Sequence, residues 1–117
     1  MLDSDGFNWT NTDGSNANDS STNYVAWCWK GGGAPTASNS ASAGATPTAG
    51  SVKIDGSNLG SALAGSIAAT KISANTKGGF STILYAGTGS NATIGHGLSA
   101  KPAFFIIKNR DGGTGMA

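Results

Sequence analysis

The sequence predicts an all-β chain with little helix, and three observations support this. The 117 residues include neither Glu nor Gln, two of the strongest helix formers. Asp-Gly pairs and runs of glycine recur along the chain, as is typical of turns between short strands. The large apolar side chains gather in short alternating or aliphatic runs, which have the length and pattern of strands.

The composition indicates a core too small to stand alone. Gly, Ala, Ser, Thr and Asn make up 74 of the 117 residues, whereas Val, Ile, Leu and Phe contribute 18. These 18 large apolar residues are a smaller share of the chain than the level of about 20% below which an independent core becomes doubtful. The net charge of +1 is nevertheless too small for a polyelectrolyte tail. We therefore expect the missing apolar cover to come from other copies or from a partner.

Several classes of protein are not expected from the bulk sequence. The seven basic residues are spread singly, which disfavours a surface that tracks nucleic-acid phosphates. No apolar run approaches the roughly 20 residues of a membrane helix, so no membrane insertion is expected. The first ten residues lack the basic start and apolar stretch of a signal peptide. One cysteine, Cys28, cannot form an internal disulfide or a cysteine zinc site, which fits synthesis in a reducing cytoplasm.

The first strand is expected over residues 24–30, where the sequence YVAWCWK alternates. Val25, Trp27 and Trp29 fall on one face of that strand, and the glycines of residues 31–33 end it. Residues 34–50 contain no large side chain. Because such a segment buries too little surface to offset the entropy of ordering, it is expected to be a flexible or extended linker.

The next segment contains two short extended pieces around an ambiguous one. SVKID (51–55) and KISAN (71–75) are expected to be short strands. Between them, three aliphatic residues recur at helical spacing: Leu59, Leu63 and Ile67. Gly60 and Gly65 interrupt that pattern, so residues 59–71 are either a marginal helix or a small-residue strand or coil.

The last third of the chain holds the clearest β pattern. A strand is expected near residues 80–86, where FSTILY alternates, and another near 102–109 around AFFIIK. Lys101 and Lys108 flank the second of these. It is apolar on both faces, as in a central strand covered by a second sheet or by a neighbouring chain. Its expected packing or assembly residues are Phe104, Phe105, Ile106 and Ile107.

A series of motifs in fixed order resembles one family. They are DSDGF (3–7), YVAWCWKGGG (24–33), SANT with GFS (73–76 and 79–81), YAGTGSNATIGHGL (85–98) and FFIIKNRD (104–111). Together they resemble segments of large structural and tail-fibre proteins of marine bacteriophages, which carry concanavalin A/laminin-G-like β-sandwich modules. The resemblance covers about two-thirds of the chain.

The resemblance implies an incomplete or shared jelly-roll-like β-sandwich. Residues 1–33 look like the closing strands of one unit, and residues 51–117 look like the opening strands of a second, with the linker 34–50 between them. The middle of a module, which should follow Arg110, is absent from the sequence. The chain therefore resembles the seam between two units, and whether it is a natural chain or a fragment is left open.

The function implied is that of a non-enzymatic virion structural protein, part of a phage tail fibre or other surface appendage. The alternative is a receptor- or glycan-binding, lectin-like module on such an appendage. The expected partners are copies of the chain itself or other virion proteins, and a host surface glycan in the alternative. A closed trimer is favoured, with an isologous dimer or a head-to-tail filament as the other arrangements. The expected location is the virion surface.

No catalytic residue, metal or cofactor is expected. His96 lies between two glycines without a second His or a Glu as partner, which favours a structural role. Cys28 is expected to be a small buried side chain. Asp3 and Asp5 precede a glycine and indicate a turn, with a rim calcium site as the alternative. A polysaccharide hydrolase is disfavoured because the carboxylates are few and lie mostly in Asp-Gly turns.

The tryptophans allow two interpretations. Trp27 and Trp29 share a strand face with Val25, which favours packing in a core or between subunits. Exposed aromatic rings also stack on sugars, so the same side chains and Trp9 are the candidate glycan contacts. Trp9 lies in a polar loop and is expected to be the more exposed of the three.

Overall fold

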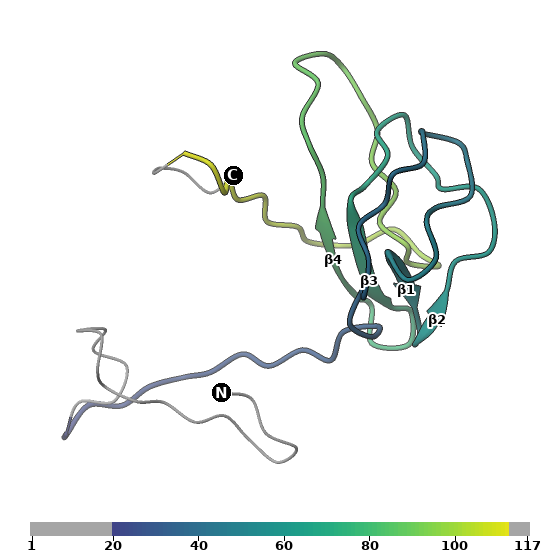
Figure 1. Cartoon of the computed structure of the whole chain (residues 1–117). Helices are drawn as coiled ribbons and strands as arrows, with labels where there is room; N and C mark the ends of the chain where they lie inside the picture. Colours follow the sequence, from purple (N-terminus) through teal and green to yellow (C-terminus); the bar gives the residue numbers. More distant parts are fainter. Residues whose placement is uncertain (1–19, 113–117) are drawn as a thin grey trace.

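The computed structural model describes residues 20–112 and contains four short strands in one mixed sheet (Figure 1). They are β1 (Val52–Ile54), β2 (Ser57–Asn58), β3 (Lys71–Asn75) and β4 (Phe80–Leu84), in the spatial order β2-β1-β3-β4. β1 and β3 are parallel, and each pairs with its sequence neighbour as an antiparallel hairpin. The described residues include no helix. The prediction of a small all-β fold is confirmed.

The turn between β1 and β2 follows directly from its two residues. Asp55 and Gly56 both have positive φ, 49° and 88°, and they join the paired residues Ile54 and Ser57. Two consecutive positive φ values are characteristic of the two-residue hairpin turn, whose twist matches that of the strands. Asp tolerates this left-handed conformation better than most side chains, and Gly adopts it freely.

The strand predictions divide into two groups. Those at 51–55, 71–75 and 80–86 are confirmed by β1, β3 and β4. Those at 24–30 and 102–109 are wrong for the single chain, because neither segment forms a strand and only Lys108 among these residues makes an isolated β-bridge. A strand requires a neighbour for its backbone groups, and both segments leave the body as extended arms (Figure 1).

The core lies on one face of the sheet. Val52 on β1 pairs with Ile72 on β3, so both side chains point to the same face, together with Ala74 two residues further along. Leu63 and Ala69, from the coil between β2 and β3, complete the buried cluster. All five residues belong to the small set of buried apolar side chains in the described part of the chain.

Residues 59–71, for which helix and coil were both open, form irregular backbone up to the start of β3. Gly65 and Ile67 instead make isolated β-bridges with Ile94. Ser66 and Thr93 reinforce this contact: the Ser66 amide donates to the Thr93 carbonyl oxygen (3.0 Å), and the Thr93 amide donates to Ser66 Oγ (2.9 Å). The residues at helical spacing, Leu59, Leu63 and Ile67, therefore belong to a coil, in which they are buried or partly buried.

Two glycine-containing segments press on the sheet at Ala74. A Cβ added to Gly32 would lie 1.7 Å from the Ala74 carbonyl oxygen. A Cβ added to Gly97, whose φ is 71°, would lie 2.9 Å from the Ala74 Cβ. Ala74 itself is completely buried. Only glycine allows these two approaches to the strand.

Residues 34–50 correct the linker prediction, because they pack against the rest of the body. The Leu63 amide donates to the Ala45 carbonyl oxygen (2.9 Å), and within the segment the Thr36 amide donates to the Gly50 carbonyl oxygen (2.9 Å). The prediction considered apolar burial alone, whereas backbone and small polar groups supply the contacts here.

Asn39 forms the hub of this segment. Its amide donates to the Thr70 carbonyl oxygen (2.8 Å), and its Nδ2 donates to the Ala69 carbonyl oxygen (3.2 Å). Its Oδ1 accepts from the amides of Ala41 and Thr48, both at 3.0 Å. One side chain thus closes its own loop and ties that loop to the residues just before β3.

A second polar contact joins the two hairpin turns. The Asp55 carboxylate accepts from the Thr76 amide at 2.8 Å and from Thr76 Oγ1 at 2.5 Å. These two hydrogen bonds, with a smaller contribution from the nearby Lys77 charge, outweigh desolvation and hold the pKa of Asp55 below its ordinary value of 3.8. Folding therefore favours the ionised form of the Asp55 carboxyl over the protonated form.

Replacing Gly32 with Ala is expected to lower the free energy of unfolding by about 1–3 kcal/mol, the usual cost of overpacking. The new Cβ must separate the N-terminal segment from β3 and so weakens the bond from the Gly32 amide to Ser73 Oγ (3.0 Å). Chemical denaturation measures the effect. Gly60→Ala is the control, because a Cβ at Gly60 meets nothing within 4 Å. Equal stabilities of the two variants would contradict the close approach.

Asp55→Asn is expected to change how stability depends on pH. A carboxyl whose pKa is lowered on folding stabilises the fold above its unfolded pKa, and that contribution disappears as pH falls through the folded pKa. Asn keeps the turn conformation and one acceptor but carries no charge. The difference in urea midpoint between wild type and variant should be largest at neutral pH and shrink below about pH 4. A constant difference from pH 7 to pH 3 would refute the role of the charge.

Candidate functional site

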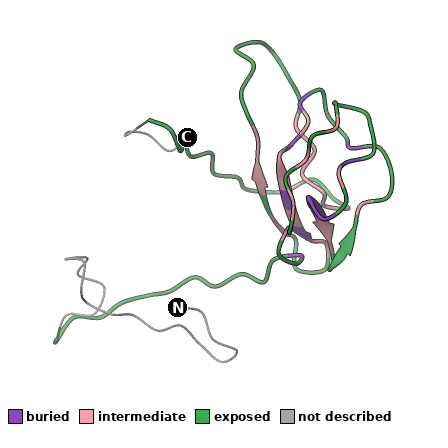
Figure 2. Ribbon diagram, viewed as in Figure 1, coloured by how far each residue is buried: buried purple, intermediate pink, exposed green. Residues whose placement is uncertain are grey.

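The most distinctive surface consists of two apolar segments that extend from the body. We call residues 20–30 the N-terminal arm and residues 102–112 the C-terminal arm. Figure 2 shows both as almost entirely exposed, in contrast with the partly buried sheet. In this view they extend to the same side, beyond β4.

The N-terminal arm is attached to the body at its last residues. Asn75 Nδ2 donates to the Lys30 carbonyl oxygen (3.1 Å). The ring of Trp29 stacks on that of Phe80, with centroids 5.6 Å apart and planes inclined by 10°. This face of the sheet is opposite the core. Phe80 and Ile83 are three residues apart on β4 and therefore point to opposite faces, and Ile83 packs against the core. The pairing gives Trp29 a packing role within the chain.

Further along the same arm, Trp27 is 72% exposed and Trp29 retains 64% exposure despite its stacking. Of the candidate glycan contacts, these two therefore lie on one accessible arm, while Trp9 lies outside the described residues. Cys28 between them is exposed, which corrects the expectation that it is buried. The reason is that its segment leaves the body, and no layer of the described residues covers it.

The C-terminal arm presents four consecutive large apolar side chains. Phe104, Phe105, Ile106 and Ile107 are between 44% and 76% exposed. The sequence predicts that they are buried in an assembly, and this stays a prediction for a single chain. Isolated apolar residues are normal on a surface, but a contiguous apolar run marks a contact site.

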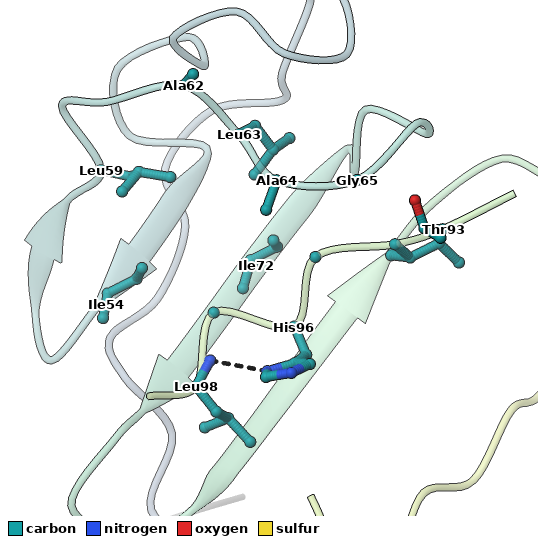
Figure 3. Close-up of a pocket in the computed structure, with 13 residues that line it drawn as sticks. Ile54, Leu59, Ala62, Leu63, Ala64, Gly65, Ile72, Thr93, His96 and Leu98 are labelled. Carbon is teal, nitrogen blue, oxygen red and sulfur yellow. Dashed lines mark hydrogen bonds between the residues drawn. The ribbon is translucent and has the colours of Figure 1, made fainter. Parts of the chain in front are cut away.

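An apolar groove of about 510 Å³ opens on the core face of the sheet (Figure 3). Ile54 and Ile72 rise into it from β1 and β3, and Leu59, Leu63 and Leu98 enclose it from the coil segments. Most of the groove is lined by aliphatic side chains and glycine backbone, and the polar side chains in its lining are those of Thr93 and His96. No local sequence pattern indicates the groove, because it is formed by segments that come together only in the fold.

His96 is the one titratable side chain that lines this groove. Its Nδ1 accepts a hydrogen bond from the Leu98 amide at 3.0 Å, which fixes the turn over the sheet (Figure 3). This agrees with the structural role expected from its flanking glycines. Among residues 20–112, no group of three or more His, Cys, Asp or Glu side chains is arranged to hold a metal ion. Nor does that part of the chain contain a helix long and apolar enough to cross a membrane.

Comparison with known proteins identifies a family. The family model described as "Domain of unknown function (DUF7483)" matches residues 53–117. Searches of curated proteins and of solved structures found no match. The matched residues contain most of the sheet and the C-terminal arm, but not the N-terminal arm or the segment around Asn39.

The contact between Trp29 and Phe80 is expected to show energetic coupling. A double-mutant cycle with Trp29→Leu and Phe80→Leu should give a coupling of about 0.5–1.5 kcal/mol, the usual value for an aromatic pair. Unfolding should be followed at the lowest workable protein concentration. The matched cycle with Trp27→Leu and Phe80→Leu should give a value near zero. Equal coupling in both cycles would mean that the stacking is not specific.

Proposed function

Because the chain belongs to the DUF7483 family of domains of unknown function, its role must be inferred from its own surface, and we propose that it is a non-enzymatic structural module. In this proposal it is part of a bacteriophage tail fibre or other surface appendage. It joins neighbouring subunits through its two apolar arms, and it resides on the virion. A closed trimer of the chain is the arrangement we favour.

The observation that carries this proposal is the exposure of Phe104 to Ile107 on an extended arm. Monomeric proteins rarely expose a contiguous run of large apolar side chains, whereas subunit interfaces are rich in them. The body behind the arm is a small sheet held by turns and hydrogen bonds, with few buried apolar side chains in its described part. A contact that buries the arm would add apolar burial that this body lacks.

The resemblance to marine phage structural proteins supplies the biological setting. Its finer structural implication is an incomplete or shared jelly-roll-like β-sandwich. We propose that subunits share such a sandwich, because the chain supplies one small sheet and two extended apolar segments. The N-terminal arm has the alternation of a strand, and the C-terminal arm is apolar on both faces, as in a central strand. Because neither arm forms a strand in the single chain, we propose that each pairs with another subunit.

A glycan-binding, lectin-like module is the alternative, and the exposure of Trp27 favours it. A ring with both faces accessible can stack on a sugar. Trp29 is the weaker candidate, because Phe80 already occupies one face of its indole. A glycan array with wild type and Trp27→Ala distinguishes the two functions. The structural role predicts no glycan signal that depends on this side chain.

The structural role predicts reversible self-association of the purified protein. Light scattering across a dilution series should give a mass above that of the 11.5 kDa chain that falls on dilution. Phe105→Asp should raise the concentration for half-association by at least about tenfold, because it places a charge at the centre of the apolar arm.

Thr88→Asp is the matched control, because it adds the same charge to an exposed loop of the body. It should leave the association unchanged. A wild-type chain that is monomeric at every concentration, or equal effects of the two substitutions, would refute assembly through the C-terminal arm.

A further inference from the structure

We propose that the outer edge of β4 binds residues 103–108 of a second copy as an added strand. This inference rests on the proposed function, since it identifies the surface that receives the C-terminal arm. The sheet has two edges, β2 and β4. β2 has two residues and is too short to receive a strand, whereas β4 has five.

The backbone of β3 determines which groups of β4 face outward. The Ile72 amide donates to the Ser51 carbonyl oxygen, and the Ala74 carbonyl oxygen accepts from the Asp55 amide, so both residues direct their backbone groups toward β1. In a strand, successive residues direct these groups to opposite sides. The alternate β3 residues, among them Ser73, therefore face β4.

The register then assigns the partners on β4. Ser73 is paired with Thr82, so Thr82 and its alternate neighbours bond to β3. Ser81 and Ile83 are left with their N–H and C=O groups pointing away from the sheet. Within the described part of the chain, no segment outside β3 forms a backbone hydrogen bond with these two residues. Such an edge is a template for another strand.

Both faces of β4 carry large apolar side chains beside this edge, together with Ser81 on one face and the exposed Thr82 on the other. Ile83 packs partly against the core on one face, while Phe80 and Leu84 are half-buried on the other. A strand added here has one row of side chains next to Ile83 and the alternate row next to Phe80 and Leu84. A strand that is apolar on both faces therefore complements this edge better than an ordinary amphipathic strand, which has one polar face.

The segment Ala103–Lys108 meets this requirement. Its central four residues are all large and apolar, so either alternation places two of them on each face of the sheet. It is already extended, and these four residues are exposed. The N-terminal arm is less suitable, because its end is tethered over the opposite face by the bond to Lys30 and by the stacking of Trp29.

The arm of the same chain does not occupy this edge. Residues 98–103 pass close to Thr76 and Gly79 beside the start of β4, where they line a small hollow. Beyond this point the arm leaves the body, as Figure 1 shows, and its apolar side chains are exposed. The occupant we assign is therefore the same segment of a second copy.

Residue-resolved amide exchange tests the edge directly. In wild type, raising the concentration into the associated range should slow exchange of the Ser81 and Ile83 amides by at least about tenfold. The Thr82 amide, bonded to β3 in both states, should change much less. If association left both outward amides unprotected, the inference would be overturned, although the proposed function would stand.

Disulfide trapping between two different chains tests the occupant. One chain carries Ser81→Cys and the other carries a cysteine at each of positions 104 to 107 in turn, both with Cys28→Ser to remove the exposed native thiol. Trapping should be strong at two of the four positions, alternating with a period of two, because only one face of the added strand meets the side chain at 81. A size tag on one chain separates the mixed product from like-chain products.

The two proposals fail in different ways. A chain that is monomeric in light scattering overturns both. A chain that associates without trapping between positions 81 and 104–107 overturns only the strand addition. Trapping within a single double-cysteine chain, but not between chains, shows that the arm closes on its own β4 and overturns the role of the second copy.

Discussion

The close approach of two glycine segments to Ala74 is the constraint on which this small body depends. Gly32 touches the backbone of β3 from one side, and Gly97 covers the Ala74 side chain from the other. Because neither segment carries a side chain at the contact, backbone lies directly on the sheet. The core can therefore be closed by few apolar residues, and an alanine on the central strand is fully buried.

Hydrogen bonds supply the order that apolar burial does not. Asn39 uses both ends of its side chain amide, and Ser51, which is completely buried, donates its hydroxyl to the Thr48 carbonyl oxygen at 2.6 Å. In the described part of the chain, every buried side-chain nitrogen or oxygen has a hydrogen-bond partner. A composition dominated by Gly, Ala, Ser, Thr and Asn is thus compatible with a defined structure, because short polar side chains satisfy the backbone of irregular segments.

The elements that local chemistry determines could be predicted from the sequence. Alternation indicates β4, the short extended piece KISAN indicates β3, and the Asp55-Gly56 pair indicates the first hairpin turn. Residues 34–50 were misjudged because their order depends on distant acceptors such as the Thr70 carbonyl oxygen, which no local pattern reveals. The arms were misjudged as strands of the single chain because alternation identifies a strand-forming segment but not its partner.

The same distinction applies to the candidate site. The apolar run from Phe104 to Ile107 was evident as a contact segment, whereas the groove and the outward groups of β4 were not. Both depend on which strands become neighbours and in what register. Phe80 was assigned to a strand, but its stacking with Trp29 required the path of the chain across Gly31–Gly33.

The packing of residues 31–51 also shows how the region matched by the family model differs from the region that folds as one body. The matched family region starts at residue 53, inside β1, so its boundary divides a strand. Gly32 and Asn39 lie upstream of that boundary and yet contact β3 and the residues leading into it. The matched residues are therefore fewer than the residues that pack together in this chain. Cutting this chain back to the matched residues would therefore remove both the glycine that lies over β3 and the side chain that closes the Asn39 loop.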